Sequence, residues 1–165
     1  MSEIEAVLDS PAVARVRAAL GACSVAADIV VLSDAAHTAR AAAAQLGCSV
    51  AQIANSLVFR TVETARPVLV MASGAGRIDP AKVAPFVGEA VAKADAQFVR
   101  EATGFAIGGV APTGHLTTPT AVLDARLFAF VEIWAAAGHP RTVFRLSPAD
   151  LFTLTRGAVG EIARD

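Results

Sequence analysis

The sequence predicts a single α+β domain, spanning residues 1–165, that is built on a mixed β-sheet. Two observations carry this prediction: helical and strand-like segments alternate along the chain, and two pairs of strands have connections short enough for antiparallel hairpins. A doubly wound parallel sheet would place a helix between almost every pair of strands. With 165 residues, 55% of them hydrophobic, the chain has enough apolar material for one core.

The first third of the chain is expected to hold two helices around one strand. A serine followed by a proline begins a helix over residues 11–20, and the glycine that follows stops it. Residues 27–32 form an apolar run with Ile and two Val, which is typical of a buried strand. Thr38 is positioned to cap an alanine-rich helix that ends before Gly47, and residues 49–52 match a capping box that predicts one helical turn.

The middle of the chain begins with a hairpin. Residues 55–62 and 67–73 are apolar strands joined by about five residues, as in an antiparallel pair. An Asp-Pro pair then starts a helix that stops near residue 88. Residues 90–94 are expected to form a short strand, and a capping aspartate begins a further helix over residues 96–103.

The last third repeats the pattern of strand, turn and hairpin. Residues 120–124 form a strand and residues 125–128 a helical turn. Residues 132–136 and 142–146 flank the sequence AGHPR, which indicates a second hairpin. The sequence SPAD then starts a final helix, which is expected to cover the C-terminus with a break at Gly157.

The stretch from Gly104 to His115, GFAIGGVAPTGH, holds four glycines and a proline. A run this rich in glycine cannot be a stable helix or strand, so it forms a shaped loop. Two interpretations stay open. The loop is a tight structural turn, or its bare N–H groups bind a phosphate, a carboxylate or a developing oxyanion without any charged side chain.

Charge and hydropathy exclude several classes of protein. The net charge is −1, whereas proteins that bind nucleic acid through its backbone usually carry a basic excess, so any RNA contact must be local. Only two of the 14 basic residues are lysines, Lys82 and Lys93, and arginine is the better bidentate partner for phosphate. No apolar run is long enough to span a bilayer, and the acidic N-terminus is no secretory signal. We expect a cytoplasmic protein that does not bind membranes.

The familiar catalytic signatures are absent from the sequence. It has no GxSxG elbow and no metal-ligand spacing such as HExxH, so neither a metal nor a cofactor is expected. Cys23 and Cys48 are far apart and are interpreted as buried free thiols. A histidine beside a turn is usually just solvated, but His115 closes the glycine-rich stretch and is a candidate for proton transfer.

Asn55 is a polar residue at the predicted entry of an apolar strand. One interpretation is that it ends the preceding turn and forms a local hydrogen bond. The other is that its amide points into the same cleft as the glycine-rich stretch. The residues alone leave both open.

Six ordered segments resemble the YbaK-type family of aminoacyl-tRNA deacylases, which is related to the editing insertion domain of bacterial prolyl-tRNA synthetase. The resemblance covers roughly residues 37–155, in the segments HTARAAAAQLG, QIANSLVFR, PVLVMASGAGRID, ATGFAIGGVAPTGH, VLD and AAGHPRTVFRLSPADLFTLT. It implies a mixed, partly closed sheet flanked by helices. It also implies hydrolysis of the ester of a mischarged tRNA, without metal, cofactor or covalent intermediate. The implied partners are the acceptor end of an aminoacyl-tRNA, with tRNA for proline expected, and prolyl-tRNA synthetase.

The resemblance also assigns site residues. The family's GxxxP loop corresponds to Gly108 through Pro112 and offers backbone donors to the reacting carbonyl. The expected catalytic residues are Asn55, Gly108 and Gly109. The expected substrate-binding residues are His37, Thr38, Ser56, Val110, Ala111, Pro112, Gly114 and His115.

The chain departs from the family at one position. Asn55, in NSL, stands where the family has a lysine, in KSL. An amide still donates a hydrogen bond but brings no charge, unless a nearby arginine such as Arg60 or Arg77 supplies it. The substitution leaves three functions open: a deacylase, a non-catalytic module that binds an aminoacyl-tRNA or a synthetase, and a hydrolase of another small ester or amide.

Overall fold

The structure is a computed structural model of the chain, and it describes residues 1–33 and 38–165. The helices within these ranges are α1 (Glu3–Leu8), α2 (Pro11–Ala22), α3 (Ala39–Leu46), η1 (Val50–Gln52), α4 (Pro80–Val87), α5 (Ala96–Thr103), η2 (Ala125–Ala129) and α6 (Pro148–Thr155). The strands are β1 (Ile29–Val31), β2 (Ile53–Thr61), β3 (Pro67–Ser73), β4 (Val91–Lys93), β5 (Thr120–Asp124), β6 (Ile133–Ala136), β7 (Thr142–Leu146) and β8 (Ala158–Gly160).

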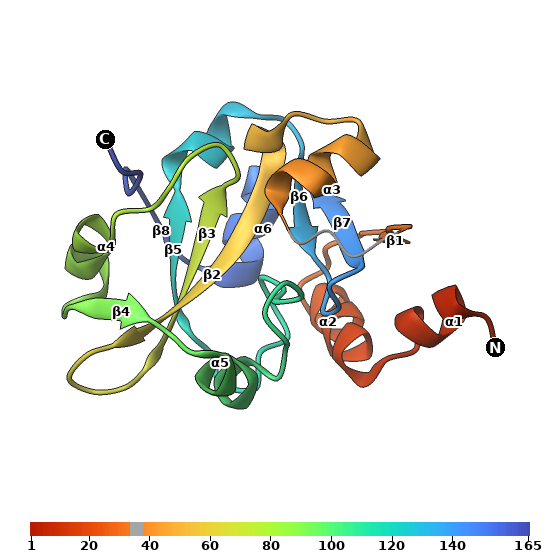
Figure 1. The fold of residues 1–165 in the computed structure, drawn as a ribbon, viewed down its shortest axis with the longest axis horizontal. Coiled ribbons are helices and arrows are strands. Elements are labelled where there is room, and N and C mark those ends of the chain that lie inside the picture. Colours follow the sequence, from red (N-terminus) through yellow and green to blue (C-terminus); the bar gives the residue numbers. More distant parts are fainter. Residues whose placement is uncertain (34–37) are drawn as a thin grey trace.

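The described strands form one mixed sheet in the order β1-β7-β6-β2-β3-β5-β8, with β4 also paired to β2 (Figure 1). The two expected hairpins are present: β2 pairs antiparallel with β3, and β6 with β7. The pairings of β2 with β6, β3 with β5 and β5 with β8 are parallel. The predicted α+β class and mixed sheet are therefore confirmed. The end strands β1 and β8 do not pair with each other in the described ranges, so the sheet is open.

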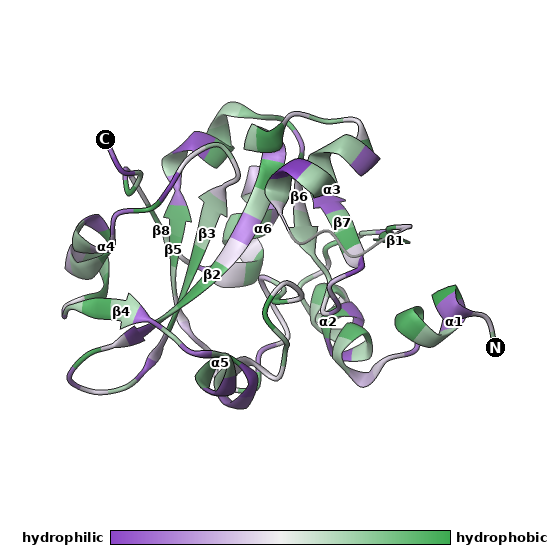
Figure 2. Cartoon of the chain, in the orientation of Figure 1, coloured by the Kyte–Doolittle hydropathy of each residue, from purple (hydrophilic) through white to green (hydrophobic). Residues whose placement is uncertain are grey.

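Helices cover both faces of the sheet. On one face, residues of α2, α5 and α6 pack with the sheet around Phe105, Phe144 and other fully buried side chains. On the other face, α4 packs over β3 and β5, and α3 packs over the start of β2. Figure 2 shows that β2 carries a hydrophilic patch near its middle, whereas its neighbour β3 is apolar along its length. Asn55 is the third residue of β2 and so lies inside the strand and not at its entry.

The start of the chain differs from the prediction in three ways. Helix α1, capped by Ser2, was not expected. Helix α2 passes through Gly21, which keeps helical geometry, and ends at Ala22, and the residue that takes the left-handed conformation is Ser24, with φ 55°. Strand β1 is not buried, since it is an end strand and Val30 is 40% exposed.

The prediction of a helix over the C-terminus is wrong. Helix α6 ends at Thr155, and Arg156 takes a left-handed conformation with φ 53°. Residues 158–160 then form β8 alongside β5. Gly157 permits this because its Cα approaches β5 so closely that a side chain there would lie 2.9 Å from the Ala121 carbonyl oxygen. None of the helices in the described ranges has the length and apolar character needed to cross a membrane.

Candidate functional site

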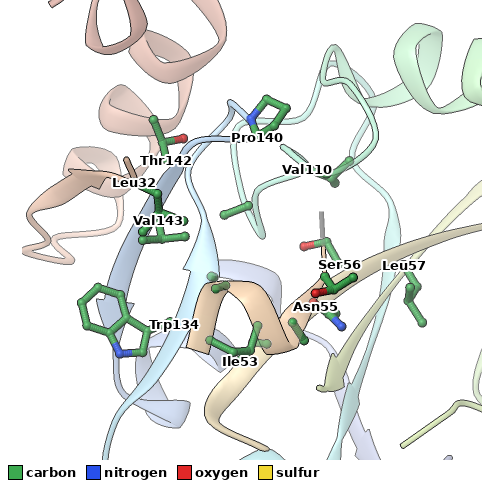
Figure 3. A pocket seen from close by; sticks show the side chains of 17 residues that line it. Leu32, Ile53, Asn55, Ser56, Leu57, Val110, Trp134, Pro140, Thr142 and Val143 are labelled. Carbon is green, nitrogen blue, oxygen red and sulfur yellow. The ribbon is translucent and has the colours of Figure 1, made fainter. Parts of the chain in front are cut away.

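The candidate site is a cavity of about 240 Å³ at the point where β2 separates from β6. β2 pairs with β6 only at Ile53 and Ala54, and with β4 only from Phe59 to Thr61. Between these two pairings, no described strand lies against that edge of β2. Figure 3 shows Trp134 and Val143 on one side of the cavity and Asn55, Ser56 and Leu57 of β2 on the other.

The open edge of β2 presents the main chain of Ser56 to this gap. The Ile53 carbonyl accepts a hydrogen bond from the Gly74 N–H (2.8 Å), on the β3 side, and the Val58 carbonyl accepts one from the Ala94 N–H (3.3 Å), on the opposite side. Main-chain groups of successive strand residues alternate between the two edges. Ser56 therefore directs its N–H and C=O toward the open edge, where the cavity lies.

Most polar side chains on the cavity wall already have hydrogen-bond partners. The Thr38 hydroxyl accepts from the Ala41 N–H (3.0 Å), the Ser56 hydroxyl donates to the Met71 sulfur (3.3 Å), and the Thr142 hydroxyl contacts the main chain of His139. The half-buried amide of Asn55 makes no hydrogen bond to any residue in the described ranges. An amide held at a cavity without a protein partner is free to bond a ligand.

The glycine-rich stretch, residues 104–115, is called the glycine loop from here on. Of the loop residues, Gly108 and Val110 line the cavity. Gly108 has a φ of 92°, which side chains rarely adopt, and Gly109 lies so close to the next turn that a Cβ there would be 2.9 Å from the His139 carbonyl carbon. These two constraints explain why glycine occurs at both positions.

The main-chain N–H donors at the cavity differ in part from those expected from the sequence. Gly109 does not line the cavity, and its N–H donates to the Ala106 carbonyl (2.9 Å). The N–H groups of Gly108 and Val110 have no acceptor within the described residues. Ala111, expected to line the pocket, is fully buried in the main core instead.

The other end of the glycine loop lies away from the cavity. Pro112, Gly114 and His115 line a separate cavity of about 160 Å³. The His115 Nε2–H donates to the Ala111 carbonyl (2.6 Å), and its ring edge meets Phe105 with 5.3 Å between ring centroids. Burial lowers the pKa of His115, which favours the neutral ring. The structure therefore places His115 at a different cavity from Asn55 and Gly108.

The cavity wall is electrically neutral in the described part of the chain, because no residue that lines it is charged. The arginines expected to replace the family's lysine charge lie elsewhere. The Arg60 guanidinium sits 5.4 Å from the centre of the Phe98 ring, and Arg77 bonds the C-terminal segment through its main chain. His37, also expected at the site, lies outside the described residues.

Several lining residues were not identified from the sequence. The hairpin of β6 and β7 was predicted, but nothing in its sequence indicated that it faces the glycine loop. The lone tryptophan of the chain, Trp134, was the one available signal, because it sits in an otherwise small-residue strand. The lining residues missed are Leu32, Ala39, Ala42, Ile53, Ala54, Leu57, Trp134, Ala135, Ala136, Pro140, Thr142 and Val143.

Other nucleophile and ligand sets are not assembled within residues 1–33 and 38–165. Cys23 and Cys48 are free and half-buried, and neither lines the cavity. Burial raises the pKa of the Cys48 thiol, which disfavours the nucleophilic thiolate. No three histidine, cysteine, aspartate or glutamate side chains of these ranges come together as metal ligands would.

Comparisons with known proteins agree on one family. The model of the aminoacyl-tRNA editing domain matches residues 33–154. The uncharacterized protein YwhH of Bacillus subtilis (strain 168) is 32% identical over 124 residues, which is 75% of this chain and 78% of that protein. The match to the family model spans every described residue of the cavity wall except Leu32.

Solved structures give the same result. A crystal structure described as a candidate trans-editing enzyme for prolyl-tRNA synthetase superposes with a TM-score of 0.88 at 40% identity, covering 94% of this chain and 99% of that one. The hypothetical protein APE2540, at 23% identity, shares the fold with a TM-score of 0.83 over 91% of this chain and 99% of its own. By its sequence and its fold, the chain belongs to the aminoacyl-tRNA editing domain family.

Proposed function

We propose that the protein hydrolyses the ester bond of a mischarged tRNA that carries a small, uncharged amino acid. The observation that carries this proposal is the cavity of about 240 Å³ between β2 and the glycine loop, whose described wall has no charged residue. Its walls are mainly Ala, Val, Ile, Pro and Trp side chains, which favour a small apolar side chain and disfavour a charged one.

The chemistry needs positioning more than it needs a reactive side chain. An aminoacyl ester is already activated, so a bound water can attack its carbonyl carbon when donors stabilise the oxyanion that forms. The water oxygen bonds to that carbon, the bond to the ribose oxygen breaks, and the water's proton passes to the departing ribose oxygen. The neighbouring ribose hydroxyl can relay this proton. The products are the free amino acid and the free tRNA.

Each part of the cavity has a role in this scheme. The Asn55 amide and the N–H groups of Gly108 and Val110 supply donors for the ester and its oxyanion. The main chain of Ser56 offers a donor and an acceptor for the amino acid's own polar groups. Trp134 and Val143 bound the space for its side chain.

The proposal also names the tRNA that carries the amino acid. A similar protein is described as a candidate trans-editing enzyme for prolyl-tRNA synthetase. We therefore propose tRNA for proline as the carrier and prolyl-tRNA synthetase as a partner. With a net charge of −1, tRNA binding should be modest and sensitive to salt.

The direct test is deacylation of a panel of mischarged tRNAs, led by alanyl- and cysteinyl-tRNA for proline. We expect rapid hydrolysis of one small amino acid, unchanged by a chelator, and loss of activity in Gly108→Val, whose branched side chain is strained at φ 92°. Thermal unfolding shows whether that variant remains folded. No hydrolysis across the panel by the folded wild type would overturn the proposal.

Asn55 offers a sharper test of the site. Removing a hydrogen bond to a charged group costs about 1.5–3 kcal/mol, so Asn55→Ala should lower kcat/KM by about 10- to 100-fold. Ser56→Ala is the matched control, because that hydroxyl bonds Met71 and the main chain of Ser56 is kept. A gain in Asn55→Lys would indicate a weakened enzyme, whereas no gain with an active wild type indicates a site tuned to work without the charge.

A second candidate function is a non-catalytic module that holds an aminoacyl-tRNA end. The neutral wall of the described cavity, with an amide where the family has a lysine, is the observation that favours it. Such a module would bind a non-hydrolysable aminoacyl-adenosine analogue and release no amino acid from any tRNA in the panel.

A further inference from the structure

A buried ion pair lies near the cavity but outside it. The Asp124 side chain, at the end of β5, is 1% exposed and pairs with Arg126 of η2 at 2.7 Å. The Arg126 Nε–H also donates to both carboxylate oxygens, at 3.1 Å each. Neither residue lines the cavity. Burying an ion pair costs desolvation energy, so the pair is weak evidence for stability, and its fixed geometry needs another explanation.

The ion pair holds the turn that follows β3. The Asp124 carboxylate accepts a hydrogen bond from the Ser73 N–H (3.0 Å), and the Arg126 guanidinium donates to the Ala75 carbonyl (2.6 Å). Gly76 lies so close to this guanidinium that a Cβ there would be 2.8 Å from its Nη1. One ion pair therefore fixes the turn at its first residue and at its middle.

The same turn holds the start of β2. The Ser73 hydroxyl donates to the Ala51 carbonyl of η1 (2.8 Å), and the Gly74 N–H donates to the Ile53 carbonyl (2.8 Å). A Cβ at Gly74 would lie 2.5 Å from a carbonyl oxygen of η1, so the turn and η1 are in direct contact. Asn55 lies only two residues after Ile53, so the position of its amide depends on this contact.

We propose that Asp124 and Arg126 are positioning residues, which hold the start of β2 through the turn after β3 and so aim the Asn55 amide at the ester. This inference rests on the proposed function, in which that amide donates to the ester and its oxyanion. Such a donor accelerates the reaction only when it meets the oxyanion at hydrogen-bond distance, so a small displacement of β2 lowers the rate.

The first test is the kinetics of Asp124→Asn, which keeps the shape of the side chain but loses the charge that pairs with Arg126. We expect kcat for the mischarged tRNA to fall by about tenfold with KM changed by less than about twofold, because the donor is displaced while the cavity wall is kept. Ser73→Ala removes the hydroxyl that bonds Ala51 but keeps the Ser73 N–H. It should lower kcat by about threefold, and it replaces Asp124→Asn throughout if that variant does not fold.

The matched control is Glu89→Gln, which breaks an ion pair at the opposite end of the β2–β3 hairpin. Glu89 pairs with Arg66 at 3.3 Å and accepts from the Thr64 hydroxyl at 2.7 Å. Neither kcat nor KM should change in this variant. An equal loss of kcat in Glu89→Gln would overturn the inference, because any weakening of the hairpin would then have the same effect.

A double variant separates positioning from general damage to the fold. If the ion pair acts through Asn55, Asp124→Asn should cost much less kcat/KM in the Asn55→Ala background than in wild type, because no amide remains to be misplaced. The same factor in both backgrounds overturns the inference and leaves the proposed function intact.

The side-chain NH₂ signals of Asn55 in NMR spectra of the full chain provide a readout that needs no turnover. They should shift in Asp124→Asn and in Ser73→Ala and stay in place in Glu89→Gln. Unshifted signals in the first two variants overturn the inference. Shifted signals, with a folded wild type that hydrolyses no tRNA in the panel, overturn the proposed function and leave the positioning of Asn55 by the ion pair.

Discussion

Asn55 shows how much the position of a single residue depends on its partners. The sequence left two roles open for its amide: a local hydrogen bond or a place in a cleft. Because β2 begins at Ile53, Asn55 lies inside the strand, paired with Ala72 of β3. A polar side chain inside a strand, at a cavity and without a partner in the described residues, favours the second role.

His115 has a structural position that its chemistry alone did not reveal. Its Nε2–H bonds the Ala111 carbonyl inside the glycine loop, while its Nδ1 is buried without a described partner. Burial is the main reason that its pKa is lowered, and the positive charge of Arg15 also lowers it. A neutral ring in this position holds the loop together through its bond to Ala111.

The lowered pKa of His115 predicts a pH dependence of stability. The unfolded chain takes up this proton near the ordinary pKa of 6.5, before the folded chain does. The contribution of the neutral ring is therefore complete above about pH 6.5 and is lost as the pH falls through the folded pKa. Urea unfolding from about pH 8 to pH 5 should show wild type losing more stability than His115→Gln. His139 and Asp124, whose pKa values are also lowered, are present in both proteins and cancel. Parallel pH profiles would contradict this assignment.

At the scale of elements, the glycine loop is held in place by a helix far from it in sequence. Arg15 of α2 donates from its guanidinium to the Gly104 carbonyl (2.7 Å) and to the Gly114 carbonyl (3.4 Å), so it fastens both ends of the loop. The same guanidinium lies 5.0 Å from the centre of the Phe105 ring. The loop is thus shaped by α2 as well as by its own glycines.

Arg15→Ala should therefore loosen the loop. We expect the free energy of unfolding to fall by about 1–3 kcal/mol, because charge-assisted hydrogen bonds and a cation–π contact are lost. Amide hydrogen exchange over residues 104–115 should also become faster. Arg17→Ala, on the same helix, is the control: Arg17 is exposed, and its removal should change stability by no more than about 0.5 kcal/mol. Equal effects of the two variants would show that Arg15 does not fasten the loop.

At the scale of the whole molecule, the C-terminal segment completes the sheet. β8 extends the sheet beyond β5, and Ile162, just after it, is fully buried against a cluster that includes Val83 of α4. The Arg164 N–H donates to the Arg77 carbonyl (2.7 Å). The segment after α6 is therefore anchored to the sheet by β8 and to the core by Ile162.

This placement predicts that Ile162→Ala destabilises the domain by about 2–5 kcal/mol, the usual cost of emptying a buried aliphatic site. Val159→Ala, in β8 itself, is the matched control, since Val159 is 44% exposed and should cost about 0.5 kcal/mol. Urea denaturation with a common m-value measures both. A small loss at Ile162 would mean that the C-terminal segment is dispensable to the core.

The sequence by itself determined most elements, because their signals act over a few residues. Thr38 caps α3, Gly47 ends it with a φ of 67°, and the two hairpins follow from short connections. Where a competing long-range contact decided the outcome, the local signal failed. The segment after Arg156 joined β5 as a strand instead of continuing a helix.

The site itself was decided by tertiary structure. Asn55, Gly108 and Trp134 come from three segments, and they meet only because β2 pairs with β6 for two residues and then separates from it. No local pattern encodes where two strands part, since that depends on how the whole sheet twists and what packs on it. The same reason explains why His115, close to Gly108 in sequence, lies at a different cavity.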